Sequence, residues 1–498
     1  MGIIIRQGLK ASAVSYVGVA IGAFSTIWLF PALLTPAQIG LLRLVQDTAF
    51  VLAGFAQLGA GNITDRFFPT FNDIRQKHHG FLVFLLLYAG LGLTVAAAFY
   101  FGFSQSLQAF YATKSPELLP YFPLIFALGG LIVYSFLLEA YARAHLRIVV
   151  PTLLREVVLK LALIGIVGGY AAGFLTFEQV LPALLVVYWL VLVALLLYLL
   201  RLGRLYWRLP DSDAFRLQIV KEMMRYAFFI LLGGISALLI LRIDTLMIGA
   251  ILGTADTGIY SIAFFMGTVI EIPRRSFAQI STPIIAKAWK DNDMAQLADL
   301  YRRSCINLSL IGSFLFLGIY CNLDNIFALI PKTEIYRQGM GVVVWVALAR
   351  WVDMSAGLNS EIILQSKYYQ INIYLSAGLA LLMVFANLLL IPWAGINGAA
   401  LGTLLSISLW NLSKVGYLWY RFGLQPFTLA NLWAIVLTAG LAGGVGLIAP
   451  MGSIWFDMAV RSVLIGILFP LLAWRLRLSP DITDWANYLG ERVKRNFS

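Results

Sequence analysis

Apolar residues fill most of this 498-residue chain in long runs, and short polar or basic turns separate the runs. Each run is long enough to cross a bilayer as a helix, which takes about 20 residues. No connection between the runs is long enough to fold as a separate domain. The pattern therefore predicts an all-α integral membrane protein with about fourteen transmembrane helices. We expect the spans at 11–34, 39–63, 80–104, 118–142, 150–174, 178–201, 224–251, 257–285, 304–329, 336–362, 370–393, 397–419, 430–450 and 454–474.

Basic residues are distributed unevenly over the connections between these spans. The connections after every second span, together with both termini, contain most of the 36 Lys and Arg residues. The opposite set of connections contains three: Lys114, Lys332 and Arg337. Because cytoplasmic loops carry an excess of Lys and Arg, both termini are expected in the cytoplasm. The net charge of +12 is thus a topology signal, and we expect contact with membrane lipids and no nucleic-acid partner.

The expected spans repeat along the chain. Spans one to six match spans seven to twelve, with an offset close to 218 residues. The turn Leu34–Gly40 falls on Leu252–Gly258 and keeps Leu, Ala and Gly at equivalent positions. Six is an even number, so both halves enter from the same side and form a parallel repeat. We expect one six-helix lobe at 1–208, a second at 209–421, and two additional helices with a cytoplasmic tail at 422–498.

Charged residues inside the spans are the candidates for function. An ionisable group at that depth is costly, and it usually faces a cavity or the protein interior. Five of them lie in spans seven and eight: Arg242, Asp244, Glu271, Arg274 and Arg275. Glu271 and Arg275 are four residues apart and can share a helix face, which leaves Arg274 without a local partner. Such a surplus of buried cations suggests a site for an anion.

Arg242 and Asp244 are two residues apart, so they point away from each other on a helix and need partners elsewhere. For Asp244, a salt bridge is favoured over a proton-binding role. Arg350 and Asp353 lie in the middle of span ten, where a position in a cavity is favoured.

The charges in spans two and five are closer to the span ends. Arg43 and Asp47 are four residues apart, and we expect a local ion pair between them. Glu156 can pair with Lys160, and for these residues snorkelling to the interface and a role in a cavity both stay open.

These arguments give two sets of candidates. The residues expected to bind an anionic substrate are Arg274, Arg275, Arg350, Arg242 and Lys160. Those expected to couple transport to an ion are Glu271, Asp244 and Asp353.

Motifs for catalysis, cofactors and metals are absent from the sequence. It has no phosphate-binding loop of the type G-x-x-x-x-G-K-[ST], so ATP hydrolysis is not expected. His78, His79 and His145 lie in expected loops and make no metal-binding pattern, and Cys305 and Cys321 are interpreted as small apolar residues. We therefore expect a protein that is not an enzyme and that needs no cofactor.

Several segments, together with the arrangement of two six-helix repeats and a terminal pair, resemble one transporter family. The segments are 8–22, 66–69, Asp244 with 258–263, 283–286 and 391–400. They are similar to those of the polysaccharide (O-antigen, Wzx-type) flippases of the multidrug/oligosaccharidyl-lipid/polysaccharide exporter superfamily. The first span lacks the mid-membrane arginine of the related lipid II flippases, which favours a cell-surface glycan as the cargo.

The resemblance implies a flippase of the bacterial cytoplasmic membrane. Such a protein moves a lipid-linked oligosaccharide of the undecaprenyl-pyrophosphate type by alternating access, through a cationic cavity, with a proton or sodium ion as the coupling ion. A polysaccharide polymerase or glycosyltransferases are candidate protein partners.

Two alternatives stay open: a multidrug or cation antiporter of the same superfamily, and a membrane glycosyltransferase or polymerase. The antiporter would need surplus carboxylates, and the enzyme would need a large outer loop. A major-facilitator carrier is disfavoured, because 61–66 begins that family's loop motif and then runs into Phe67-Phe68-Pro69.

The charge distribution predicts the topology directly. Reporter fusions after Arg208 and after Arg303 should give cytoplasmic signals, and fusions near Lys114 and Pro331 should give signals from the outer side, because basic loops stay in the cytoplasm. An outer-side signal at Arg208 would contradict the helix count and the repeat.

Overall fold

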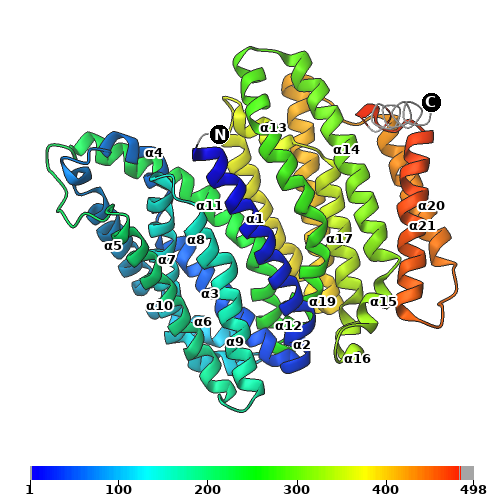
Figure 1. The fold of residues 1–498 in the computed structure, drawn as a ribbon, viewed down its shortest axis with the longest axis horizontal. Helices are drawn as coiled ribbons and strands as arrows, with labels where there is room; N and C mark the ends of the chain where they lie inside the picture. Colours follow the sequence, from blue (N-terminus) through cyan, green and yellow to red (C-terminus); the bar gives the residue numbers. More distant parts are fainter. Residues whose placement is uncertain (1–2, 482, 484–498) are drawn as a thin grey trace. The chain divides into compact units, whose positions relative to one another are not determined.

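The computed structural model describes residues 3–481 and 483, and every regular element in them is helical (Figure 1). The described residues contain ten helices that are long and apolar enough to cross a membrane, or up to eleven if one bent pair counts as a single span. The prediction of an all-α fold is confirmed, whereas the count of fourteen spans stays a prediction.

The chain divides into two compact units, residues 1–261 and 262–498. The main helices of unit 1 are α1 (Ile3–Phe24), α3 (Pro36–Ala56), α4 (Ala60–Phe71), α5 (Phe81–Gly102), α7 (Phe122–Ala144), α8 (Val149–Leu153), α9 (Leu159–Ala171), α10 (Phe177–Arg201) and α11 (Leu217–Ile251), with α12 (Thr254–Thr268) crossing the boundary. Those of unit 2 are α13 (Ile272–Lys290), α14 (Met294–Tyr320), α17 (Met340–Ser355), α18 (Asn359–Gln365), α19 (Gln370–Phe422), α20 (Leu429–Gly446) and α21 (Ile454–Arg475). The boundaries expected from the repeat, 208/209 and 421/422, are not those of the compact units and stay a prediction.

Shorter elements connect or interrupt these helices. They are the π-helices η1 (Ser25–Leu29) and η4 (Leu154–Val158), the 3-10 helices η2 (Lys77–Gly80), η3 (Pro116–Tyr121), η5 (Val269–Glu271) and η6 (Arg337–Gly339), and the short α-helices α2 (Phe30–Leu33), α6 (Ser104–Ala112), α15 (Leu323–Ala328) and α16 (Thr333–Tyr336).

The element α19 consists of two helices, which correspond to the expected spans 370–393 and 397–419. The backbone leaves helical geometry between them, at Ala394 and at Gly395, where φ is 59° and ψ is −139°. Only glycine adopts that conformation readily, and the expected turn is present here. The two helices pack against each other, because a Cβ at Gly402 would lie 3.4 Å from the Cβ of Ala386. The expected span 150–174 is also helical up to Ala171, and the π-helix η4 divides it into α8 and α9.

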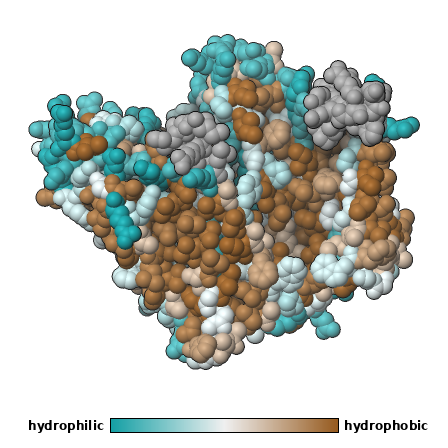
Figure 2. All heavy atoms as spheres, viewed as in Figure 1, coloured by the Kyte–Doolittle hydropathy of each residue, from teal (hydrophilic) through white to brown (hydrophobic). Residues whose placement is uncertain are grey.

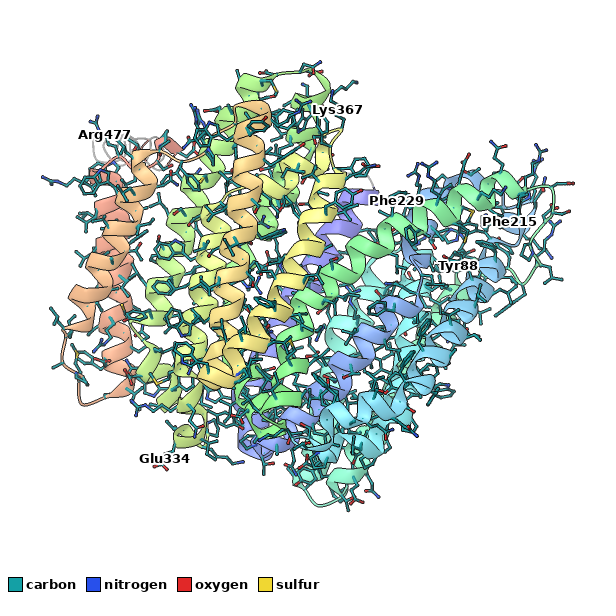
Figure 3. All side chains as sticks on the ribbon, turned by 180° about the vertical axis from the view of Figure 1, so that it is seen from behind. Tyr88, Phe215, Phe229, Glu334, Lys367 and Arg477 are labelled. Atoms are coloured by element: carbon teal, nitrogen blue, oxygen red, sulfur yellow. The ribbon has the colours of Figure 1, made fainter. Side chains whose placement is uncertain are left out.

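The surface of the helices suits lipid rather than water. On α5, Leu87 is 62% exposed and Leu91 59%, and on α19 Leu381 is 72% exposed. Exposed apolar area of this extent is unfavourable in water. In Figure 2, hydrophobic side chains cover the middle of the helices on the visible face, and hydrophilic ones gather at the ends of α13 and α14. In unit 2, Lys367 and Arg477 lie at one end and Glu334 at the other (Figure 3).

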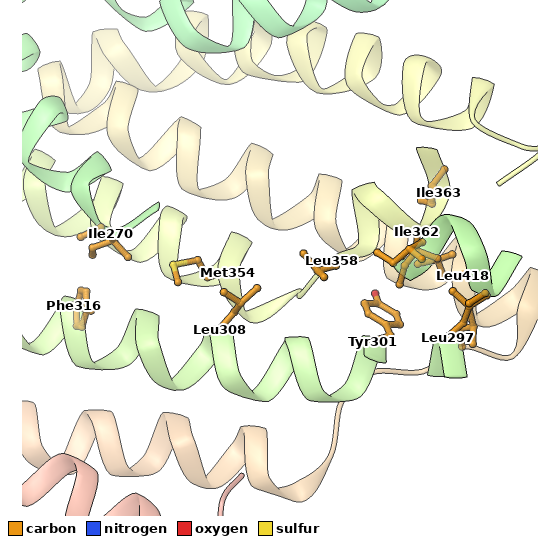
Figure 4. Packing of buried hydrophobic residues seen from close by; sticks show 14 residues of the cluster. Ile270, Leu297, Tyr301, Leu308, Phe316, Met354, Leu358, Ile362, Ile363 and Leu418 are labelled. Atoms are coloured by element: carbon orange, nitrogen blue, oxygen red, sulfur yellow. The ribbon is translucent and has the colours of Figure 1, made fainter. Parts of the chain in front are cut away.

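The core of unit 2 is a layer of apolar side chains between α14, α17 and α18. Leu308 of α14 lies next to Met354 of α17, Phe316 lies near Ile270 at one end of the layer, and Tyr301 lies near Ile362 at the other (Figure 4). This layer fixes the spacing of the helices that carry the charged residues described below.

The terminal helices α20 and α21 pack on the other side of α14. Within α21, Arg461 Nε lies 2.8 Å from Asp457 Oδ2, one helical turn away. Arg461 also donates to the carbonyl oxygens of Ile448, Val445 and Cys321, so this buried guanidinium is well supplied with acceptors. The terminal pair is therefore an integral part of unit 2.

Two of the three histidines lie in an aromatic cluster at one end of unit 1. The ring centroids of His78 and His145 are 5.4 Å apart, and Phe68 packs on both. Burial, and then the nearby His78 and Arg204, lowers the pKa of His145 from 6.5 to about 4. The neutral ring is thus favoured in the folded state, and its contribution to stability is complete above pH 6.5 and falls as the pH drops toward 4.

The turns that open α3 and α12 touch through their backbones in unit 1. A Cβ atom at Gly40 would lie 1.8 Å from the carbonyl oxygen of Thr254, and one at Gly258 would lie 2.0 Å from that of Pro36. Gly40 and Gly258 are equivalent in the expected repeat, as are Pro36 and Thr254. The contact is therefore reciprocal, and it explains why both turns keep glycine at this position.

This contact predicts a strict requirement for glycine. Gly258→Ala should lower the free energy of unfolding by about 1–3 kcal/mol, because the added methyl group overlaps a backbone oxygen that cannot move away easily. Gly165→Ala in α9 is the matched control, since a Cβ there meets no atom within 4 Å. Thermal unfolding in detergent measures both variants. Equal melting temperatures for the two would contradict the close contact.

Candidate functional site

Four charged residues of unit 2 pair crosswise between two neighbouring elements. Glu271 and Arg274 stand three residues apart where η5 passes into α13, and Arg350 and Asp353 have the same spacing on α17. Arg350 Nη1 lies 3.1 Å from Glu271 Oε2, and Arg274 Nε lies 3.5 Å from Asp353 Oδ2. Arg350 and Asp353 are both 7% exposed. Each helix therefore supplies one cation and one carboxylate to the other.

The backbone near Glu271 explains why these side chains meet. The helix that begins at Thr254 changes to one 3-10 turn at Val269–Glu271, and α13 follows with Pro273 in its first turn. Proline suits that position because the first N–H groups of a helix have no partner in the helix. Just before the turn, a Cβ at Gly267 would lie 2.8 Å from Val346, so the chain approaches α17 closely here.

Two further charges complete the contacts of this pair of elements. Arg274 Nη2 lies 3.4 Å from Glu361 Oε2 on α18. Arg275 Nε lies 3.4 Å from Glu271 Oε1, as the spacing of four residues predicts, and its side chain is 69% exposed. The expectation that Arg274 lacks a partner holds only for its own helix: in the folded unit it lies between Asp353 and Glu361.

Behind Asp353 lies a chain of buried amides. Asn411 of α19 donates to Asp353 Oδ1 at 2.9 Å, and Asn359 donates to the side-chain oxygen of Asn411 at 2.8 Å. Lys414, one turn further along α19, is 0% exposed, and its Nζ donates to the Ser360 hydroxyl at 2.5 Å.

Sequence reasoning missed Lys414 and Glu361. Both lie within expected spans, so the rule that selected Arg350 applies to them as well. They stand near the span ends, where a charged side chain can reach the interface, and only the packing of α17, α18 and α19 shows that Lys414 is buried.

We call these residues the unit 2 charge cluster. Its members are Glu271, Arg274, Arg275, Arg350, Asp353, Glu361 and Lys414. Four of them are cations and three are carboxylates, so the cluster has one surplus positive charge.

Unit 1 pairs its mid-helix charges differently from the expectation. Asp47 forms its ion pair with Arg242 of α11 rather than with Arg43. The expected local pair is wrong, because the packing of α3 against α11 brings Arg242 to Asp47, and Arg242 also lies over the Phe50 ring at 4.8 Å. The separation of Arg242 from Asp244 is as expected: Asp244 accepts a hydrogen bond from the Tyr260 hydroxyl at 2.7 Å.

A second group of charges in unit 1 lies in η4 and at the start of α9. Arg155 lies 2.6 Å from Glu139 of α7 and 3.3 Å from Glu156. Lys160 lies 3.1 Å from Glu156 and donates to the backbone oxygen of Gly18 at 2.9 Å. These side chains are only partly exposed and pair with one another, which favours a protein-lined surface over snorkelling to the interface.

The π-helical geometry of η4 fits this arrangement. Insertions of this kind into α-helices occur often at functional sites, and here the insertion places Arg155 and Glu156 next to α1 and α7. A Cβ at Gly18 would lie 2.6 Å from the carbonyl oxygen of Glu156, so α1 packs directly on η4.

The candidate residues thus fall into three groups. Arg274, Arg275, Arg350, Glu271 and Asp353 belong to the unit 2 charge cluster, whereas Arg242 and Asp244 lie on α11 and Lys160 on α9 of unit 1. Their roles in substrate binding and ion coupling are addressed in the next subsection.

Comparison with solved structures identifies the fold. The chain is similar to the lipid II flippase MurJ in an inward closed conformation, with 11% identity, a TM-score of 0.72, and coverage of 93% of this chain and 98% of that one. It is also similar to an inward-facing multidrug resistance MATE family transporter of the MOP superfamily, with 13% identity, a TM-score of 0.62, and coverage of 87% and 98%. The protein is therefore a multi-pass helical membrane protein with the fold of transporters and flippases, as the sequence predicted.

The family is shown by the sequence. The profile described as "Polysaccharide biosynthesis protein" matches residues 5–289, more than half of the chain. The protein belongs to this family. A search of curated protein sequences found no match. The expectation that the protein is not an enzyme agrees with the solved structures of this fold, which are those of a flippase and a transporter.

Proposed function

We propose that the protein flips a lipid-linked oligosaccharide of the undecaprenyl-pyrophosphate type across the bacterial cytoplasmic membrane, for the synthesis of a cell-surface polysaccharide. Transport proceeds by alternating access, and both termini lie in the cytoplasm. The family and the flippase fold support a lipid-linked substrate. The observation that carries the proposal is the unit 2 charge cluster, in which three largely buried cations face three carboxylates and Arg275, 69% exposed, adds one surplus positive charge.

A pyrophosphate fits this cluster chemically. Guanidinium groups bind phosphate oxygens in a bidentate manner, and such charge-assisted bonds are strong where water is excluded. Arg275 is the most exposed cation of the cluster and can make the first contact. Arg350 and Arg274 lie behind it and already face carboxylates, which a phosphate can displace.

The charge count disfavours an antiporter for organic cations. Such a carrier needs surplus carboxylates where its substrate binds, whereas four cations face three carboxylates here. A glycosyltransferase or polymerase is disfavoured by the fold, which is that of transporters.

Glu271 is the residue that we propose to couple transport to a proton. Its two oxygens face different arginines, Arg350 at 3.1 Å and Arg275 at 3.4 Å. When the substrate phosphate draws these arginines away, the carboxylate loses its counter-charges and takes up a proton, which it releases when the arginines return. Asp244 and Asp353 are the alternative carriers, and each accepts a hydrogen bond from a neutral donor, Tyr260 or Asn411.

The cationic cluster can be tested by substitution. Arg350→Ala or Arg274→Ala should abolish export of the surface glycan while the protein still reaches the membrane, because a phosphate contact is lost. Arg→Lys at the same positions should restore export only in part, since an ammonium group cannot replace a bidentate guanidinium. Surface glycan and membrane protein level are measured in the same cells.

Arg303→Ala serves as the control. Arg303 is also paired with carboxylates of unit 2, Asp299 and Asp481, but it lies outside the cluster and is largely exposed. Normal export from Arg274→Ala, Arg275→Ala and Arg350→Ala alike would exclude the cationic site.

The coupling role of Glu271 requires a reconstituted system. Glu271→Gln should still bind the lipid-linked sugar, but its transport rate should no longer respond to an imposed pH gradient, because the amide cannot carry a proton. Transport by the wild-type protein should rise several-fold with the gradient. If the wild-type protein responds to sodium instead, or to no ion gradient, the proton scheme is wrong while flipping itself can still stand.

A further inference from the structure

Lys414 has an unusual environment for a lysine. Its side chain is completely buried in unit 2, its Nζ donates to the Ser360 hydroxyl, and it lies over the Trp410 ring. Among the residues that the structure describes, no carboxylate lies within ion-pair distance of it. Its hydrogen-bond partner Ser360 is the chain neighbour of Glu361, and Asn411, three residues before it, donates to Asp353. A buried ammonium group without a direct counter-ion is costly, so its position calls for a functional reason.

The same two carboxylates are held by Arg274, and they are held loosely. Arg274 Nε lies 3.5 Å from Asp353 Oδ2, and Arg274 Nη2 lies 3.4 Å from Glu361 Oε2. Tight bonds between a guanidinium and a carboxylate are about 2.7–2.9 Å long. The Nε of Arg274 is also buried without a hydrogen-bond acceptor. Arg274 is therefore poised to exchange these carboxylates for better acceptors.

A phosphate that takes Arg274 would leave two buried carboxylates behind. Losing the partner of a buried charge is strongly unfavourable, and this cost would oppose substrate binding. Asp353 keeps one hydrogen bond, from Asn411, which does not neutralise its charge. For Arg274 to leave Asp353 and Glu361 and bind a phosphate, a second cation must already lie near these carboxylates.

We propose that Lys414 is that cation: a positioning residue that balances Asp353 and Glu361 when Arg274 turns to the substrate. Lys414 does not touch the substrate. It lowers the cost of releasing Arg274, and so it sets the affinity of the unit 2 charge cluster for a pyrophosphate. This role rests on the proposed function, because it assumes that the ligand of Arg274 is an anionic phosphate.

The arrangement of the helices supports this role. Ser360 and Glu361 are neighbours on α18, and Asn411 and Lys414 are three residues apart on α19. Asn411 binds Asp353, and Lys414 binds Ser360. The ammonium group is thus anchored to Ser360, the chain neighbour of Glu361, by a contact that does not involve Arg274, and it keeps this contact when Arg274 moves.

The test uses the full-length protein in detergent and a polyprenyl pyrophosphate without a glycan as the probe. Binding is measured as the rise in melting temperature with probe concentration, which also shows whether each variant is folded. Lys414→Met should weaken binding tenfold or more, because Arg274 must then stay with Asp353 and Glu361. Glu361→Gln alone should tighten binding, since Arg274 loses one of its two carboxylates.

The decisive variant is the double substitution Lys414→Met with Glu361→Gln. The double variant removes one positive and one negative charge, so its cluster has the same net charge as the wild-type cluster. Binding of the probe should therefore recover to within a few-fold of wild type. A lysine that only fills space would show no such recovery. The control is Arg461→Met with Asp457→Asn, which neutralises a buried pair outside the cluster and should leave binding unchanged.

The outcomes separate the two proposals. If the wild-type protein does not bind the pyrophosphate probe, the proposed function fails. If it binds and Lys414→Met binds equally well, or if the double variant does not recover, the role of Lys414 is overturned and the proposed function stands. Should Lys414→Met fail to fold, weaker binding by Glu361→Gln alone would still refute the exchange.

Discussion

The need to neutralise charges inside apolar helices organises both units of this protein. Each arginine, lysine or carboxylate in a membrane span must find a partner or water. In unit 2 this need is met by the crosswise pairs Glu271–Arg350 and Arg274–Asp353, which tie the η5–α13 junction to α17. In unit 1 it is met by Asp47 and Arg242, which tie α3 to α11. The charges to which we assign a role in transport are thus also contacts that position the helices.

The pairs differ in how firmly they are held, and the difference follows their proposed roles. Arg461 and Asp457, far from the proposed substrate site, are 2.8 Å apart, and Arg461 has three carbonyl acceptors in addition. Arg274 lies 3.4–3.5 Å from its two carboxylates. Short bonds suit an ion pair that only stabilises the fold. Longer and weaker bonds suit an ion pair whose arginine must leave its carboxylate to bind a substrate. The role proposed for Lys414 follows the same reasoning, because a second cation near these carboxylates would lower the cost of releasing Arg274.

Glycine provides the second constraint. At Gly40 and Gly258 the chain allows backbones to touch, and at Gly267 it allows the approach to α17 that brings Glu271 to Arg350. Where the expected repeat places equivalent glycines, the structure has a reciprocal contact between them. The repeat itself stays a prediction, and this contact is the structural feature that it would place on its axis.

The sequence by itself determined the all-helical membrane class, because runs of about 20 apolar residues have few other uses. It also identified Glu271, Arg274, Arg350 and Asp353 as unusual, since charges stand out against an apolar background. The sequence did not predict which charged residues on different helices pair with each other. Spacing along one helix favoured an ion pair between Arg43 and Asp47, and it offered no partner for Arg274. In the structure, helices distant in sequence pack together, and Asp47 pairs with Arg242. Arg274 pairs with Asp353 and Glu361.

Lys414 shows the same limit most clearly. In the sequence it is a basic residue near a span end, where a lysine usually reaches the interface. In the folded protein it is completely buried, and its Nζ donates to the Ser360 hydroxyl. Local periodicity decides which residues are helical and which face is apolar. Only tertiary packing decides which charges meet, because an ion pair depends on distances of a few ångströms between helices that the sequence does not relate.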